Sequence, residues 1–154
     1  MSGRALLALA LVAATPKGPT MHHATGSFTV TMTPEAQAPA IDASLPTSRM
    51  GIAKTFAGAM TGTAHGTMLA AGTPGPGQPA AYVAVDQFTG SVDGRAGGFV
   101  LLHRGTITRA GDADLSVTIA PDTGTGALAG IAGTLTIEVA GGVHRYDLAY
   151  TLPG

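Results

Sequence analysis

The chain has 154 residues, a formal net charge of -1 and 11% charged side chains, so it lacks the basic surface that nucleic-acid binding requires. It contains no cysteine, which excludes a disulfide framework and thiolate chemistry. Its 23 glycines and 10 prolines, together with frequent Thr and Val, are typical of short β-strands joined by tight turns. The composition therefore predicts an all-β domain.

The first twenty residues form a separate unit. Arg4 precedes an uninterrupted apolar run at 5–14, and the last three residues of that run, Val-Ala-Ala, resemble the pattern before a signal-peptidase cut. The run is shorter than the roughly 20 residues that a membrane-spanning helix needs. We therefore expect 1–20 to be a signal peptide and disordered linker, 21–154 to be the barrel domain, and the protein to be exported (secreted or periplasmic). The alternative is a cytoplasmic protein whose true start is Met21.

The rest of the chain is predicted to be strands without helical segments. Alternation of polar and apolar residues predicts strands at 26–32 and 49–58, and another over 58–70 after a bend. Prolines place 34–46 in a loop, and the glycines and prolines of 72–79 predict a second loop. Further strands are expected at 81–90, 97–106, 114–120, 134–139 and 146–152. About eight strands with hairpin-length connections avoid exposed edges most simply by closing into a single antiparallel β-barrel.

The clearest local signal is a β-hairpin centred on the Asp-Gly step at 93–94, which separates two apolar, β-branched and aromatic segments. A two-residue type I′ turn requires positive φ at its glycine. This turn also predicts the register of the hairpin. Asp86 is expected opposite Leu101, and Ala84 opposite His103.

The hairpin register makes Asp86 and His103 the candidate catalytic residues. They become diagonal neighbours on one face, about 7–8 Å apart by ordinary sheet spacing. That face is expected to be the inner one, because Phe99, Leu101 and His103 alternate with the solvent-seeking Arg104. A desolvated Asp86 would have a raised pKa suited to acid–base work. The alternative is a buried acid and a core histidine that only satisfy each other or the backbone.

Other side chains of the predicted inner surface are candidate ligand contacts. They are Lys54, Tyr82, Phe88, Phe99, Leu101 and Tyr150. Lys54 shares a face with Ile52 and Phe56, and two interpretations are open for it. It either pairs with Asp86 as a buried ammonium or keeps its ammonium in solvent at a sheet edge, and the sequence favours the second.

No metal site or cofactor is expected. The histidines are scattered without the spacing of a ligand set. The glycines of 124–133 lack the strand-turn-helix context of a dinucleotide-binding loop. No G-x-S-x-G motif is present, so the chain offers no hydrolase nucleophile elbow.

Several blocks of the sequence occur together and in order. They are KTFAG at 54–58, YVAVDQFTGSVDGR at 82–95, FVLLH at 99–103, TGTGALAGIAG at 123–133 and YDLAY at 146–150. In these blocks, which span nearly all of the chain after its first 24 residues, the sequence resembles the bacterial domain-of-unknown-function family 3224. The resemblance implies a barrel similar to that of allene oxide cyclase, whose mostly apolar lumen folds a flexible substrate. Asp86 stands where that family usually has a glutamate, and Ala127 where it usually has another.

Three functions are compatible with these observations. The first is a barrel that binds a small apolar molecule in an open lumen. The second is a cofactor-independent cyclase or isomerase that folds a flexible substrate and assists it by weak acid–base chemistry. The third is a structural or envelope protein with a filled barrel. The sequence leaves the ligand and the oligomeric state open, and it predicts no membrane span.

Overall fold

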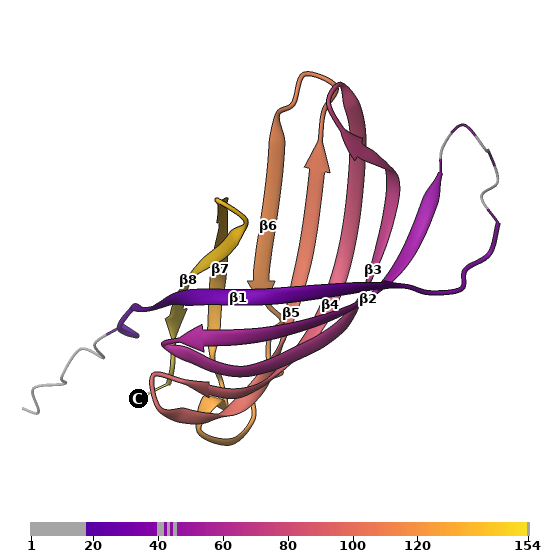
Figure 1. Cartoon of the computed structure of the whole chain (residues 1–154). Coiled ribbons are helices and arrows are strands. Elements are labelled where there is room, and N and C mark those ends of the chain that lie inside the picture. Colours follow the sequence, from indigo (N-terminus) through magenta and orange to yellow (C-terminus); the bar gives the residue numbers. More distant parts are fainter. Residues whose placement is uncertain (1–17, 40–41, 43, 45, 154) are drawn as a thin grey trace, which may run out of the picture.

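The computed structural model describes residues 18–39, 42, 44 and 46–153. Within them, eight antiparallel strands follow one another around a closed barrel, and the last strand pairs with the first (Figure 1). The strands are β1 (His22–Pro34), β2 (Thr47–Gly58), β3 (Met60–Gly75), β4 (Gln78–Val92), β5 (Arg95–Ile107), β6 (Ala113–Ile119), β7 (Ala132–Ala140) and β8 (Val143–Thr151), with a short 3-10 turn, η1 (Gly126–Leu128), before β7. The predicted all-β fold and single antiparallel barrel are confirmed. The expected signal peptide lies outside the described residues.

The two-residue period of the strands separates an inner from an outer face. On β4, Ala84, Asp86 and Phe88 are buried, whereas the intervening Val83 and Val85 are 53% and 54% exposed. Successive side chains of a strand point to opposite faces, so this alternation places the even-numbered residues of β4 inside the barrel.

The hairpin of β4 and β5 has the predicted turn and register. Asp93 has a φ of 48° and the following glycine a φ of 77°, as a type I′ turn requires. Asp86 pairs with Leu101, and Ala84 pairs with His103. The expected placement of the acid and the imidazole on one inner face is therefore confirmed.

Gly94 provides a first test of this turn. Replacing Gly94 by valine should lower the free energy of unfolding by about 1 kcal/mol or more, because a β-branched residue is strained at positive φ. Gly94→Asn is the matched control, since asparagine tolerates the left-handed region far better. Urea denaturation of the three proteins measures the difference. Equal stability of the valine variant and the wild type would contradict the assigned turn.

The loop predicted at 72–79 is much shorter than expected. β3 continues to Gly75 and β4 begins at Gln78, with a register shift between Gly72 and Gly75. The shift disrupts the ladder locally, as a β-bulge does. Pro79 is tolerated in β4 because pairing with β5 begins only at Ala80, so its missing N–H costs no ladder bond on that side.

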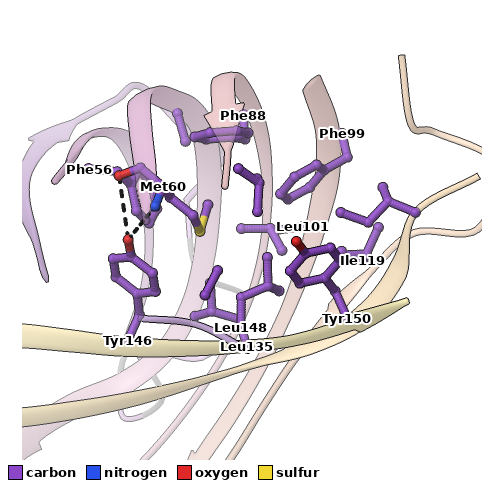
Figure 2. Packing of buried hydrophobic residues seen from close by; sticks show 14 of the residues in the cluster. Phe56, Met60, Phe88, Phe99, Leu101, Ile119, Leu135, Tyr146, Leu148 and Tyr150 are labelled. Carbon is purple, nitrogen blue, oxygen red and sulfur yellow. Dashed lines mark hydrogen bonds between the residues drawn. The ribbon is translucent and has the colours of Figure 1, made fainter. Parts of the chain in front are cut away.

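One half of the barrel is filled by a packed apolar cluster (Figure 2). The ring of Phe56 packs edge-on against Phe88 and Tyr146, with ring centroids 5.5 Å apart in both pairs. The hydroxyl of Tyr146 accepts a 2.7 Å hydrogen bond from the backbone N–H of Met60 and lies 3.2 Å from the carbonyl oxygen of Ala57, to which it donates. These contacts leave this half of the lumen occupied by protein side chains.

At the other end of the barrel the strands differ in length. Strands β3 to β6 rise past the short hairpin of β7 and β8 (Figure 1), and β6 and β7 share one registered pair, Thr118 with Thr134. Inward-facing Met32 and Leu115 are 43% and 42% exposed there, and Met68 is half-buried. Inward-facing apolar side chains are therefore partly exposed to solvent at this end of the barrel, which we call the mouth.

Candidate functional site

Three ionisable side chains lie together at the boundary between the packed half and the mouth. Lys54 comes from β2, Asp86 from β4 and His103 from β5, and all three point inward. Their exposed fractions are 7%, 0% and 7%. They are the buried charged or polar residues of the part of the chain that the structure describes. Charged groups are rarely buried unless they are paired, so their contacts decide what the cluster can do.

Asp86 is the centre of this cluster. Its Oδ2 accepts a hydrogen bond from Lys54 Nζ and lies 3.1 Å from His103 Nε2. Lys54 Nζ is also 3.4 Å from His103 Nε2. The interpretation of Lys54 that the sequence favoured, an ammonium held in solvent at a sheet edge, is wrong. Its long side chain instead carries the ammonium to the carboxylate, which offsets the cost of burying both charges.

These contacts determine the ionisation of Asp86. Burial alone would raise the pKa of its carboxyl group, but the hydrogen bond from His103 and the charge of Lys54 hold the pKa below its usual value. Asp86 is therefore a carboxylate at neutral pH. The raised pKa expected from desolvation alone does not occur, because the two partners supply more stabilisation of the charged form than burial removes.

The lowered pKa predicts the direction of a pH effect on stability. A group whose pKa is depressed in the folded state stabilises the fold above its unfolded pKa, near 3.8, and loses that contribution as pH falls through the folded value. The stability difference between the wild type and Asp86→Asn should therefore shrink as pH falls from 5 toward 2. Urea denaturation at each pH measures it. A difference that grows with acidification would contradict the assignment.

The Asp86 contact also orients the ring of His103. Nε2 is closer to the carboxylate than to the ammonium, so it donates its proton to Asp86. In the neutral imidazole this leaves Nδ1 with a free lone pair. Among the described residues Nδ1 makes no side-chain hydrogen bond, and Asp86 Oδ1 is the fully enclosed side-chain polar atom without a partner. Nδ1 is thus not among the fully enclosed polar atoms that lack a partner.

Tyr82 lies on β4 beside the cluster, four residues before Asp86, and is half-buried on the inner face. Burial raises the pKa of its hydroxyl, and the negative charge of Asp86 raises it further. Its ring covers Gly105 of β5, where a Cβ would collide with the ring. Tyr82 is thus a neutral aromatic side chain at the inner wall of the mouth.

The other predicted ligand contacts lie in the packed half. Phe88, Phe99, Leu101 and Tyr150 are each no more than 2% exposed. The hydroxyl of Tyr150 donates a 2.6 Å hydrogen bond to Asp93 Oδ2 in the hairpin turn. Burial, followed by this bond and the charge of Asp93, raises the pKa of Tyr150 to about 12. In this structure these residues form the floor beneath the cluster.

Two glycines of the site were not singled out from the sequence. Gly66 of β3 pairs with Asp86, and a Cβ there would collide with Asp86 Oδ1 and the carbonyl oxygen of Val85. Gly105 makes the corresponding space for Tyr82. The signal for both was a glycine inside a strand pattern, which often marks a close approach of another group.

Within the described residues, no group of three or more His, Cys, Asp or Glu side chains is arranged to hold a metal ion. Asp86 and His103 share their oxygen and nitrogen with the ammonium of Lys54, whose positive charge opposes a cation at this position. No helix in the described part of the chain has the length and apolar character of a membrane span.

Comparison with known proteins agrees with the fold. Residues 24–150 match the family described as "Protein of unknown function (DUF3224)". The chain belongs to this family. A protein of unknown function from the DUF3224 family of Shewanella oneidensis MR-1, solved by crystallography at 1.84 Å, is 37% identical, with a TM-score of 0.79. That match covers 88% of this chain and 100% of the Shewanella chain. A search of curated proteins gave no match.

Proposed function

We propose that this DUF3224 protein binds a small apolar molecule in the mouth of its barrel, with a polar group of the ligand on His103. The observation that carries the proposal is the buried cluster at the base of an apolar mouth. Asp86 Oδ2 is paired with Lys54 and lies 3.1 Å from His103 Nε2, whereas Asp86 Oδ1 is buried without a hydrogen-bond partner. Pockets for small molecules combine apolar walls with a few well-placed polar groups of this kind.

The walls of the mouth favour a flexible or elongated ligand. Met32, Met50 and Met68 are inward-facing and half-buried or exposed, and methionine side chains adapt to irregular shapes. Leu115, beside Gly105 in the register of β5 and β6, adds an apolar surface that is 42% exposed. Covering these side chains would remove apolar surface from water, which is the main driving force for such binding.

A charge placed in the mouth tests the binding site. The neutral dye N-phenyl-1-naphthylamine can be titrated without interference from tryptophan fluorescence, because the chain contains no tryptophan. The wild type should give saturable fluorescence enhancement, and Leu115→Lys should weaken binding by about tenfold or more. The matched control is Val143→Lys, a valine 45% exposed on the outer face of β8, which should bind like the wild type.

Two results would overturn the proposal. One is a wild type without saturable binding, and the other is equal affinity of Leu115→Lys and the wild type. Native mass spectrometry of protein purified from its own source identifies the natural ligand, as a mass that is retained by Val143→Lys and lost from Leu115→Lys.

A second candidate function is a cofactor-independent cyclase or isomerase. The observation that favours it is the pairing of Asp86 with His103 Nε2, because a carboxylate on one ring nitrogen orients the imidazole and leaves the other nitrogen to accept a proton. Nδ1 would take a proton from a substrate carbon and return it at another atom of the same molecule. No redox partner is needed for such a step.

This second function has a probe reaction of its own. In 5-nitrobenzisoxazole, removal of one carbon-bound proton breaks the N–O bond and releases a coloured phenolate. The wild type should accelerate ring opening, and His103→Ala should reduce the rate by about 100-fold or more. An equal rate for the wild type and His103→Ala would exclude base catalysis by this residue while leaving the binding proposal intact.

A further inference from the structure

The outer face of β3, β4 and β5, which we call the apolar face, carries a block of exposed apolar side chains among mostly uncharged polar residues. Its centre is formed by Leu69, Val83, Val85 and Leu102, which are 53%, 53%, 54% and 41% exposed. Leu69 pairs with Val83 and Val85 pairs with Leu102, so the four side chains form one block across three strands. Large exposed apolar patches of this kind usually mark interaction sites on soluble proteins.

The apolar face carries almost no charge. Within the described residues of β3, β4 and β5, Arg104 is the one Lys, Arg, Asp or Glu at an outward position. Its guanidinium donates a 2.8 Å hydrogen bond to Asp114 on β6, so its charge is already paired. Outward positions of β7 and β8, by contrast, carry Glu138, Arg145 and Asp147.

The size of this face fits a protein interface. The three strands present roughly twenty outward positions, and at ordinary strand and residue spacings these cover about 700 Å². A standard stable interface buries about 800 Å² on each partner. At one end, residues 37–39 of the β1–β2 connection and Leu69 and Val83 line a groove of about 910 Å³, which leaves room for side chains of a partner.

We propose that the apolar face is the contact between two copies of this chain, related by a two-fold axis. A face whose one charge, Arg104, is already paired favours a partner with as little charge, and the same face on a second copy has this property. When two twisted sheets pack face to face, their strand directions differ by about 30° and the sheets lie about 10 Å apart. This packing brings the apolar blocks of both copies together at the two-fold axis. This contact lies on the outer side of the sheet, and the groove at its end is lined in part by Tyr82 and Gly105 of the mouth.

The mass in solution tests the proposal. Size-exclusion chromatography with light scattering at about 50 μM should give twice the mass of one chain for the wild type. Val85→Lys places two like charges near the two-fold axis and should weaken the dimer by at least 100-fold, giving the mass of one chain. Leu102→Lys should do the same. The control Val143→Lys, equally exposed but on β8, should remain dimeric.

Both lysine substitutions are at sites about half exposed, so the variants should keep the β-sheet circular dichroism spectrum of the wild type. A monomeric wild type, a higher oligomer, or dimers of Val85→Lys and Leu102→Lys with wild-type affinity would each overturn the proposal. Dye titration of monomeric Val85→Lys tests the ligand site separately. Retained dye binding in this variant would show that loss of the dimer does not remove the proposed ligand site.

Discussion

Replacing Asp86 by alanine should lower the free energy of unfolding by about 3–5 kcal/mol, among the largest effects expected for a single substitution here. Asp86 is fully buried and is the partner of both Lys54 and His103. Without it, the ammonium of Lys54, a residue that is 7% exposed in the wild type, has no carboxylate beside it. An uncompensated buried charge costs far more than the pair itself contributes to stability.

Two controls separate this effect from the loss of any ion pair. Asp114→Ala removes the partner of Arg104 in an exposed pair, with side chains 56% and 63% accessible, and should cost less than about 1 kcal/mol. Lys54→Met combined with Asp86→Leu removes both charges and should be less destabilising than Asp86→Ala alone. Urea denaturation measures all three. If Asp86→Ala and Asp114→Ala lowered the free energy of unfolding equally, the Lys54, Asp86 and His103 cluster would not be an energetically coupled unit.

The hairpin and its register could be predicted from the sequence because they depend on local chemistry. An Asp-Gly step at 93–94 adopts the two positive φ values of a type I′ turn, and the turn then sets which residues face each other. Asp86 and His103 lie on the two strands of this hairpin, so its register predicted that both side chains lie on the same face. The barrel followed from the alternation of the strands and from the need to avoid exposed edges.

The contact between Lys54 and Asp86 could not be predicted in the same way. The two residues lie on β2 and β4, with β3 between them, so their distance depends on the registers of two strand pairs. Periodicity placed Lys54 on a face with Ile52 and Phe56 but said nothing of what its ammonium reaches. A glycine inside a strand pattern marked Gly66 as unusual, but the group that it accommodates could not be predicted, because that side chain comes from the neighbouring strand.

The extent of the lumen also depends on long-range geometry. Each strand was recognisable alone, but the open mouth results from unequal strand lengths and from the single registered pair between β6 and β7. Tyr82, Asp86 and Phe88 all lie on the inner face of β4. The sequence pattern therefore did not distinguish a residue of the packed floor from a residue of the mouth wall. Their exposure does, since Phe88 is 1% exposed and Tyr82 is half-buried.

Replacing Phe88 by alanine should therefore lower the free energy of unfolding by about 3–5 kcal/mol. The ring of Phe88 lies 5.5 Å from Phe56 in an edge-on contact and 4.9 Å from Phe99, between centroids, so its removal leaves a cavity in the middle of the aromatic floor. At roughly 3 °C per kcal/mol for a domain of this size, the melting temperature should fall by about 10–15 °C.

Phe88→Leu is the matched comparison, because it keeps part of the volume and should cost clearly less than the alanine variant. Calorimetry measures both, and dye titration well below the melting temperature measures the mouth. Since the Lys54, Asp86 and His103 cluster separates Phe88 from the mouth, we expect the leucine variant to bind the dye as the wild type does. A melting temperature unchanged in Phe88→Ala would contradict the packed floor, and a large loss of dye affinity in Phe88→Leu would extend the ligand site below the cluster into the half that the aromatic rings fill.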